Sequence, residues 1–254
     1  KRQNISVLFV SHKLEELFEI ADMFTVIRDG QYIDARPRDQ MDNDTLISLM
    51  VGRKVEFVHQ GADKLGDVVL EVRHLSRYGN FKDVSFTVRK GEIVSLSGLV
   101  GAGRTEVVQA ICGLEPADSG EIHGFQKPSA VFQEDRLLPY LTAAKNISVA
   151  AGCTETAAEK ALLQVGFDPE DLKKNAVQLS GGMARRVSIV RAMLTSGDAV
   201  LLDEPFKGLD DQTREKVVQF VKETRQHRTL ILVTHDPRDA KDLNAAQILN
   251  MEPV

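Results

Sequence analysis

The sequence is poor in cysteine. Its 254 residues include only Cys112 and Cys153, which lie far apart and lack the spacing of a metal site. The first residues show no pattern typical of a signal peptide. These absences argue against a disulfide framework and predict a reduced, cytosolic setting.

Long apolar runs are also missing. No run approaches the ~18 consecutive apolar residues that a membrane-spanning helix needs. If the protein works at a membrane, we therefore expect it to dock onto a partner that spans the bilayer.

Positive charge is not in excess. The formal net charge is −5, with 43% hydrophobic and 27% charged residues, which is the profile of an ordinary globular protein. Because there is no basic field to attract phosphate backbones, nucleic acid is not expected as a partner.

An internal repeat is present. The apolar run that ends at His12 is similar to the run that ends at His235, and the two segments align without a gap at a constant offset of 223 residues. A spacing close to the size of one domain predicts a duplication. Residues 1–51 are then the C-terminal end of a first copy, residues 52–67 a linker, and residues 68–254 a complete second domain.

The first copy carries further signals of local structure. Residues 7–10 form an apolar run of strand type, and a charged helical stretch follows His12. The dipeptide Asp29-Gly30 predicts a hairpin between Arg28 and Gln31, and residues 43–50 read as a closing helix.

A glycine-rich loop follows the buried-strand pattern of residues 93–97. It matches the phosphate-binding template G-x-x-x-x-G-K-[ST] at every defined position but one. Glycines let backbone N–H groups approach phosphates, and the following helix adds its partial positive charge. The predicted nucleotide-binding residues are Gly98, Leu99, Val100, Gly101, Ala102, Gly103, Arg104, Thr105 and Glu106.

Two positions of this loop need comment. Thr105 is expected to place its hydroxyl on Mg²⁺. Arg104 stands where the template has Lys, and its planar fork is bulkier than an ammonium group. The simpler alternative for the whole motif is a plain glycine turn between a strand and a helix.

Two acids end the apolar run of residues 199–202. A buried parallel strand can deliver Asp203 to the Mg²⁺ shell, and Glu204 can polarise an attacking water molecule. The alternative is a strand that ends in a solvated acidic turn. That alternative is less favoured here, because the two acids follow a predicted phosphate-binding loop by about 100 residues.

A second anion-binding pattern opens the helical run of residues 184–194. Ser180, Gly181 and Gly182 offer a hydroxyl, exposed N–H groups and a helix dipole. A Ser at a helix start can also be only an N-cap.

These motifs together resemble the ATP-binding-cassette family of transporter ATPases. The phosphate loop, Gln133, the Ser-Gly-Gly motif, the Asp203-Glu204 pair, Asp210 in Gly-Leu-Asp and His235 occur in the family's order and span roughly residues 68–254. The resemblance implies an α/β fold with a P-loop NTPase core containing a mixed sheet. It also implies an antiparallel β subdomain and a helical subdomain at about residues 137–194.

The resemblance also implies roles for single residues. Gln133, Glu204 and His235 would be catalytic, with Gln133 joining Thr105 and Asp203 at the metal. Asp210 would lie on the seam between two cassettes. Tyr78 is expected to stack on adenine. Phe81 competes for that role, and either aromatic could belong to the core instead.

One branch of the family fits best. Residues 49–53 and the Arg-containing loop of residues 98–106 resemble the second domain of tandem ATPases from bacterial monosaccharide importers of the ribose, galactose and xylose type. The chain departs from that branch by keeping His235, and it has Met183 where Gln is usual.

The expected function is an ATP-binding and ATP-hydrolysing subunit that uses Mg²⁺ and powers a membrane importer, with a monosaccharide as the expected solute. Its partners would be transmembrane permease subunits, a second nucleotide-binding domain and, indirectly, a solute-binding protein, and it would sit peripherally on the inner face of the cell membrane. An alternative, favoured by Arg104 and Met183, is a regulatory cassette that closes on ATP without appreciable turnover. A soluble relative acting in DNA repair or translation is a third class, but the chain has neither heptads nor a basic stretch.

Overall fold

A computed structural model describes residues 7–9, 14–28, 31–42, 45–46, 49, 66–98 and 101–251. The chain divides into two compact units, Lys1–Glu56 and Phe57–Val254, and each is described by itself. His12, Leu99, Val100 and most of the predicted linker lie outside the described residues.

The first unit is built on the predicted hairpin. Helix α1 (Leu14–Ile20) precedes strands β1 (Met23–Arg28) and β2 (Gln31–Pro37), which pair antiparallel with Arg28 opposite Gln31, and the short 3₁₀ helix η1 (Arg38–Gln40) follows. The ring of Phe18 from α1 lies 4.7 Å from that of Phe24. The buried core of this unit comprises Phe24, Val26, Met41 and Leu46.

The predicted strand at residues 7–10 is not seen in its described part. Val7, Leu8 and Phe9 have no strand structure and are exposed. A strand needs a hydrogen-bonding neighbour, and in the described part of this unit β1 and β2 pair only with each other. The segment at the matching position of the second unit, residues 229–233, is a buried strand that pairs with a parallel strand on each side.

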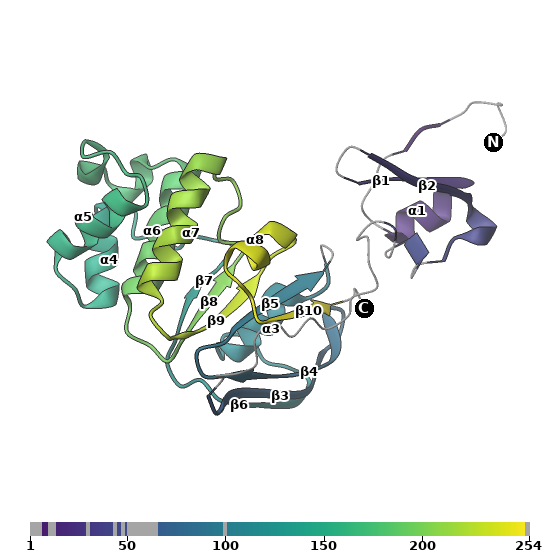
Figure 1. The fold of residues 1–254 in the computed structure, drawn as a ribbon, viewed down its shortest axis with the longest axis horizontal. Helices are drawn as coiled ribbons and strands as arrows, with labels where there is room; N and C mark the ends of the chain where they lie inside the picture. The colour runs from purple at the N-terminus through teal and green to yellow at the C-terminus, as the bar shows by residue number, and fades with distance from the viewer. Residues whose placement is uncertain are drawn as a thin grey trace. The chain divides into compact units, whose positions relative to one another are not determined.

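The second unit is organised around a five-stranded sheet (Figure 1). Its strands are β5 (Ile93–Gly98), β7 (Pro128–Val131), β8 (Ala199–Asp203), β9 (Thr229–Val233) and β10 (Gln247–Met251), in the order β10-β5-β9-β8-β7. All described pairings in this sheet are parallel. The prediction of a mixed sheet is therefore wrong in this detail, because the antiparallel strands form a separate layer.

That layer is the antiparallel sheet β4-β3-β6, which matches the predicted β subdomain. Its strands are β3 (Val68–Arg77), β4 (Phe81–Arg89) and β6 (Ser119–His123).

Apolar side chains cover both faces of the parallel sheet. In β8, Val200 and Leu202 join one buried cluster, while Ala199 and Leu201 join the other. Strands covered on both faces read as continuous apolar runs, as in β8 and β9. Figure 1 shows the helices α4–α7 on one side of the sheet and α3 with the antiparallel sheet on the other.

The helices are α3 (Arg104–Ile111), α4 (Ala143–Ala151), α5 (Glu155–Gln164), α6 (Gly181–Leu194), α7 (Asp211–Thr224) and α8 (Pro237–Asp242). Two 3₁₀ helices, η3 (Asp171–Lys173) and η4 (Ala176–Gln178), connect α5 to α6. The helices α4, α5 and α6 pack on one another, in the range predicted for the helical subdomain. Every helix in the described part of the chain is too short or too polar to traverse a bilayer.

Among the described residues of this unit, every α-helix except α3 begins with a side-chain cap. The side chains of Thr142, Thr154, Ser180 and Asp210 each accept a hydrogen bond from a backbone N–H in the first turn of the next helix. Helix α3 instead begins after Gly103, whose side-chain-free backbone provides no such cap. The N–H groups at the start of α3 therefore remain open to a ligand.

Leu201→Ala should destabilise the second unit by about 2–5 kcal/mol, because it leaves a cavity in a buried strand. Leu201 is fully buried on β8. Leu114→Ala is the matched control, since this leucine is 53% exposed, and it should cost under about 0.5 kcal/mol. Chemical denaturation of both variants measures the difference, and equal losses would contradict the assigned core.

Candidate functional site

The predicted site residues gather at one edge of the parallel sheet. The glycine loop follows β5, Gln133 follows β7, the Asp203-Glu204 pair ends β8 and His235 follows β9. Since β5, β9, β8 and β7 are neighbours in this order and run parallel, their carboxyl ends lie side by side. Ligands of open parallel sheets bind at this edge.

The glycine loop needs Gly103 for two reasons. Its φ of +71° lies in the left-handed region, which side chains disfavour. A Cβ atom there would also lie 2.3 Å from the carbonyl oxygen of Asn80, so no side chain fits. The loop thus rests against the β3–β4 turn. In the same loop Gly98 ends β5, Gly101 is exposed and Ala102 is buried.

Exposure to solvent distinguishes the two aromatic side chains that are candidates for stacking on adenine. Tyr78 lies in the β3–β4 turn beside the loop and is 97% exposed. Phe81 is 1% exposed and belongs to the apolar core. Of the two, Tyr78 is therefore the side chain free to meet a ligand.

Arg104 points into the protein. Its Nη1 donates a hydrogen bond of 2.8 Å to the carbonyl oxygen of Thr234, and its Nη2 lies 3.8 Å from Glu204 Oε1. Burial lowers the pKa of this guanidinium, while the charges of Glu204, Asp203 and Glu106 act in the opposite direction. Glu106 itself is half-buried in the first turn of α3. Arg104 thereby links the loop to the ends of β8 and β9.

Asp203 is a buried carboxylate without a regular hydrogen bond. Both oxygens are inaccessible to solvent and accept no hydrogen bond of normal geometry. Burial raises its pKa from 3.8 to about 6, although the nearby Thr105 hydroxyl offsets part of the rise.

Such orphaned carboxylate oxygens beside a hydroxyl fit a small, hard cation with oxygen ligands. No group of three or more His, Cys, Asp or Glu side chains suited to a metal occurs among the described residues. A bound ion would therefore take its other ligands from hydroxyl or amide side chains, from water or from a phosphate.

Glu204 and His235 form a close pair. His235 Nδ1 lies 2.8 Å from Glu204 Oε1, and because an ionised carboxylate only accepts, Nδ1 is the donor. This leaves Nε2 as the ring nitrogen that can face a ligand. Glu204 has a φ of +47°, an uncommon conformation for this residue that tends to occur at functional sites.

Gln133 lies in an exposed position on a loop that helix α6 holds in place. Arg185 donates to the carbonyl oxygens of Phe132 and Gln133, both at 2.6 Å. One and two turns later, Ser188 and Arg191 donate to the carbonyl of Asp135 at 2.9 Å. Sequence analysis missed this clamp, although its residues recur every three positions along one helix face.

Ser180, Gly181, Gly182 and Asp210 lie together in a different place. Ser180, Gly181 and Asp210 are exposed, and Ser180 and Asp210 cap α6 and α7. A Cβ on Gly182 would touch Leu209, so the two motifs are neighbours. Their helices pack on one another, whereas α3 packs on β4, β5 and β8.

Comparison with known proteins decides the family. A family model described as ABC transporter matches residues 81–207, half of the chain. The chain belongs to the ABC transporter family.

The relatives of this ABC transporter chain include ATP-binding proteins of sugar import. The "Putative ribose/galactose/methyl galactoside import ATP-binding protein" of Geobacillus kaustophilus is 32% identical over 92% of the chain and 52% of its own length. "Ribose import ATP-binding protein RbsA 3" of Rubrobacter xylanophilus is 34% identical over 90% of the chain and 52% of its own length. The chain thus spans about half the length of these relatives, and the predicted resemblance is confirmed.

Solved structures confirm the fold of the ABC transporter chain. The "Dimeric structure of a post-hydrolysis state of the ATP-binding cassette MJ0796 bound to ADP and Pi" matches 72% of the chain and 96% of its own chain, with 24% identity and a TM-score of 0.65. The α/β cassette fold is therefore the one predicted from the sequence motifs.

Asp203→Asn should stabilise the metal-free ABC transporter chain at pH 7. A folded-state pKa of about 6 against 3.8 means that the carboxylate charge destabilises the fold once the pH exceeds both values. At pH 7 the buried charge of Asp203 lowers the free energy of unfolding by about 3 kcal/mol. Burying the amide of Asn also has a cost, so we expect Asp203→Asn to raise the free energy of unfolding by about 1–2 kcal/mol.

The same gain should vanish below about pH 4, where Asp203 is protonated in both states. Asp198→Asn is the control, because this carboxylate accepts bonds from the backbone N–H groups of Gln126 and Lys127 and its loss should destabilise. Denaturation in chelator-treated buffer measures both variants. A loss of stability in Asp203→Asn at pH 7 would contradict the assignment of Asp203 as a buried carboxylate without a regular hydrogen bond.

Proposed function

We propose that this chain binds ATP at the carboxyl edge of its parallel sheet and hydrolyses it as the ATPase part of a membrane importer, with a monosaccharide as the transported class. The observation that carries the proposal is the Glu204–His235 contact of 2.8 Å at the same sheet edge as the glycine loop. The names of the relatives support the sugar.

The triphosphate would lie on the glycine loop. The uncapped start of α3 presents open N–H groups and the positive end of the helix dipole, which together favour phosphate. The exposed Tyr78 beside the loop would stack on adenine.

Mg²⁺ would be held by Asp203 and Thr105, with Gln133 completing the protein ligands. The two unpaired oxygens of Asp203 support this assignment. When bound, the ion would neutralise charge on the phosphate oxygens.

Hydrolysis would use the paired side chains at the ends of β8 and β9. Glu204 would orient a water molecule and accept its proton as the water oxygen bonds to the γ-phosphorus. The bond from that phosphorus to the β–γ bridging oxygen breaks in the same step, which releases ADP and phosphate. His235, held through Nδ1, presents Nε2 towards the γ-phosphate. This pairing favours turnover over the regulatory alternative.

A second cassette would complete the site. The exposed Ser180, Gly181 and Asp210 suit contacts with a partner's nucleotide, which the start of α6 would cap. The solved MJ0796 cassette is described as dimeric. Closure of the two cassettes would convert binding energy into movement.

The remaining partners would be transmembrane permease subunits and, through them, a solute-binding protein. The exposed Leu138, Tyr140 and Val177 support a docking surface on the helical part. They are neighbours, since Val177 N–H donates to the carbonyl of Pro139 at 3.1 Å. The chain would then work in the cytoplasm at the inner face of the cell membrane.

Residues 1–51 would be the end of a first cassette. Support comes from the recurrence of elements at the predicted offset: α1 begins at Leu14 and α8 at Pro237, and Phe24 of β1 matches Gln247 at the start of β10. The domain boundaries stay a prediction.

Glu204→Gln should lower phosphate release by about 100-fold or more, because the proton acceptor is lost. Binding of Mg-ATP should stay within a few-fold. A steady-state assay at increasing protein concentration, with Glu215→Gln of the exposed α7 surface as control, checks this. Equal phosphate release in the parent and in Glu204→Gln would discard the enzyme assignment.

Arg104→Lys should tighten Mg-ATP binding by about 3- to 10-fold. A lysine ammonium cannot hold both Thr234 and Glu204 as the guanidinium does, and it fits between phosphates more readily. Calorimetry measures the affinity, with the exposed Arg238→Lys as control. Unchanged or weaker binding would assign Arg104 itself to the phosphates.

A further inference from the structure

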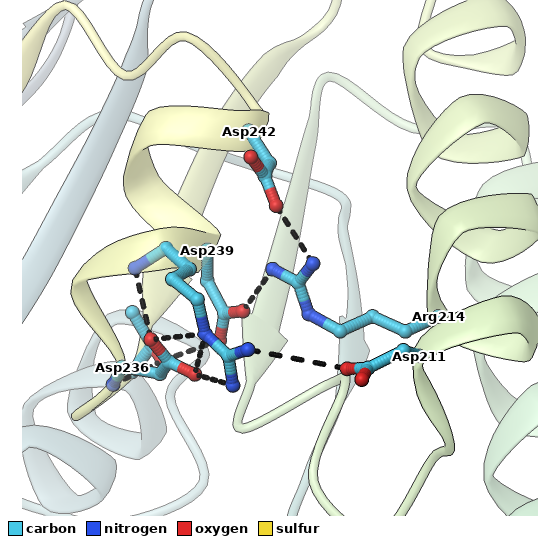
Figure 2. A network of polar contacts seen from close by, with 7 residues as sticks. Asp211, Arg214, Asp236, Asp239 and Asp242 are labelled. Carbon is cyan, nitrogen blue, oxygen red and sulfur yellow. Dashed lines mark hydrogen bonds and ion pairs between the residues drawn. The ribbon is translucent and has the colours of Figure 1, made fainter. Parts of the chain in front are cut away.

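Arg214 on α7 joins two helices that flank the site. Its guanidinium donates to Asp239 and Asp242 of α8, both at 2.7 Å, as Figure 2 shows. It also lies 5.4 Å from the centre of the Phe206 ring, two residues after Glu204. One guanidinium therefore contacts the segment after β8 and the helix after β9.

Further hydrogen bonds connect Asp239 to the residues that follow β9. The second oxygen of Asp239 accepts a hydrogen bond of 2.6 Å from the Thr234 hydroxyl, and that hydroxyl accepts the N–H of Asp236 at 3.0 Å. Asp239 and Thr234 are 4% and 1% exposed. Hydrogen bonds in such surroundings hold their partners in a fixed direction.

Thr234 connects this network to the proposed chemistry. It directly precedes His235, and its carbonyl oxygen accepts the hydrogen bond from Arg104. Arg104 and His235 in turn both contact Glu204 Oε1. A shift of Thr234 would therefore move two of the groups that surround this oxygen.

We propose that Arg214 is a positioning residue for hydrolysis, which sets the Glu204–His235 contact by fixing the segments after β8 and β9 relative to each other. The inference rests on the proposed ATPase function.

A purely structural role of Arg214 and a positioning role differ in what they require of the side chain. Removing one partner of a buried ion pair leaves the other charge unpaired and lowers stability, so a loss of stability in Arg214→Met alone would not identify a positioning role. Positioning requires the guanidinium itself, because only a planar fork can stack on Phe206 and bond Asp239 at the same time.

The chain offers a matched pair of variants. Asp239 and Asp242 lie on the same helix at the same distance from Arg214, but only Asp239 also contacts Thr234. We expect Arg214→Met and Asp239→Asn to lower kcat by about 10- to 100-fold and to change KM for ATP by less than about threefold. Asp242→Asn should keep kcat within about twofold.

Two further variants separate positioning from folding. Arg228 is a half-buried arginine that donates to the carbonyls of Thr195 and Met193, away from the site. Arg228→Met should leave kcat of the folded protein within about twofold, even where it lowers stability. Arg214→Lys, which keeps the charge but not the fork, should fall between Arg214→Met and the parent.

Steady-state phosphate release of the full chain and its variants measures these effects, and Asp239→Asn serves where Arg214→Met does not fold. The inference is overturned when Arg214→Met and Asp239→Asn keep kcat within about twofold. It is also overturned when Asp242→Asn or Arg228→Met falls as far as they do.

Amide hydrogen exchange tests the inference without turnover. Arg214→Met should speed exchange in residues 234–240 by about tenfold, while Asp242→Asn should not. A parent chain that releases no phosphate would discard the proposed function alone, and the exchange result would then decide the positioning role. Unchanged exchange in Arg214→Met would refute it.

Discussion

The burial of the parallel sheet on both faces is the constraint on which the rest of the second unit depends. Two apolar clusters take alternate residues of β8 and β9, so the interior of these two strands is apolar. Their polar residues, Asp203 and Thr229, stand at the strand ends. Because the strands are parallel and adjacent, their carboxyl ends bring the glycine loop, Asp203 and His235 to one edge. The position of the site is a consequence of the packing.

Buried and half-buried arginines hold the segments at that edge. Arg185 and Arg191 bind the carbonyls of the loop that carries Gln133, Arg104 binds the carbonyl of Thr234, and Arg214 binds the helix after it. A guanidinium offers several donors in a rigid plane and can satisfy loop carbonyls that no secondary structure pairs. Arg104, Arg185 and Arg191 thus offset the cost of burying irregular backbone beside the proposed nucleotide site.

Local patterns were predictable from the sequence. The glycine loop, the acids at the end of β8 and the hairpin between Arg28 and Gln31 each depend on residues within one turn or strand, so spacing alone indicates them. Predictions about pairing were weaker. Residues 7–9 have an apolar composition typical of a strand but form none, because a strand requires a neighbour that composition does not reveal. The expected mixed sheet failed for the same reason, since strand direction depends on which segments meet.

By itself, the sequence determined the family and the α/β fold class, together with the identity of Gly103, Asp203 and Glu204 as candidates, because each carries a short-range signature. Only the tertiary structure decided which aromatic is exposed beside the loop, where Arg104 points, and that Arg214 reaches Thr234 through Asp239. These relations join residues from different strands and helices. They arise from packing and hydrogen-bond geometry across the fold, which no local pattern encodes.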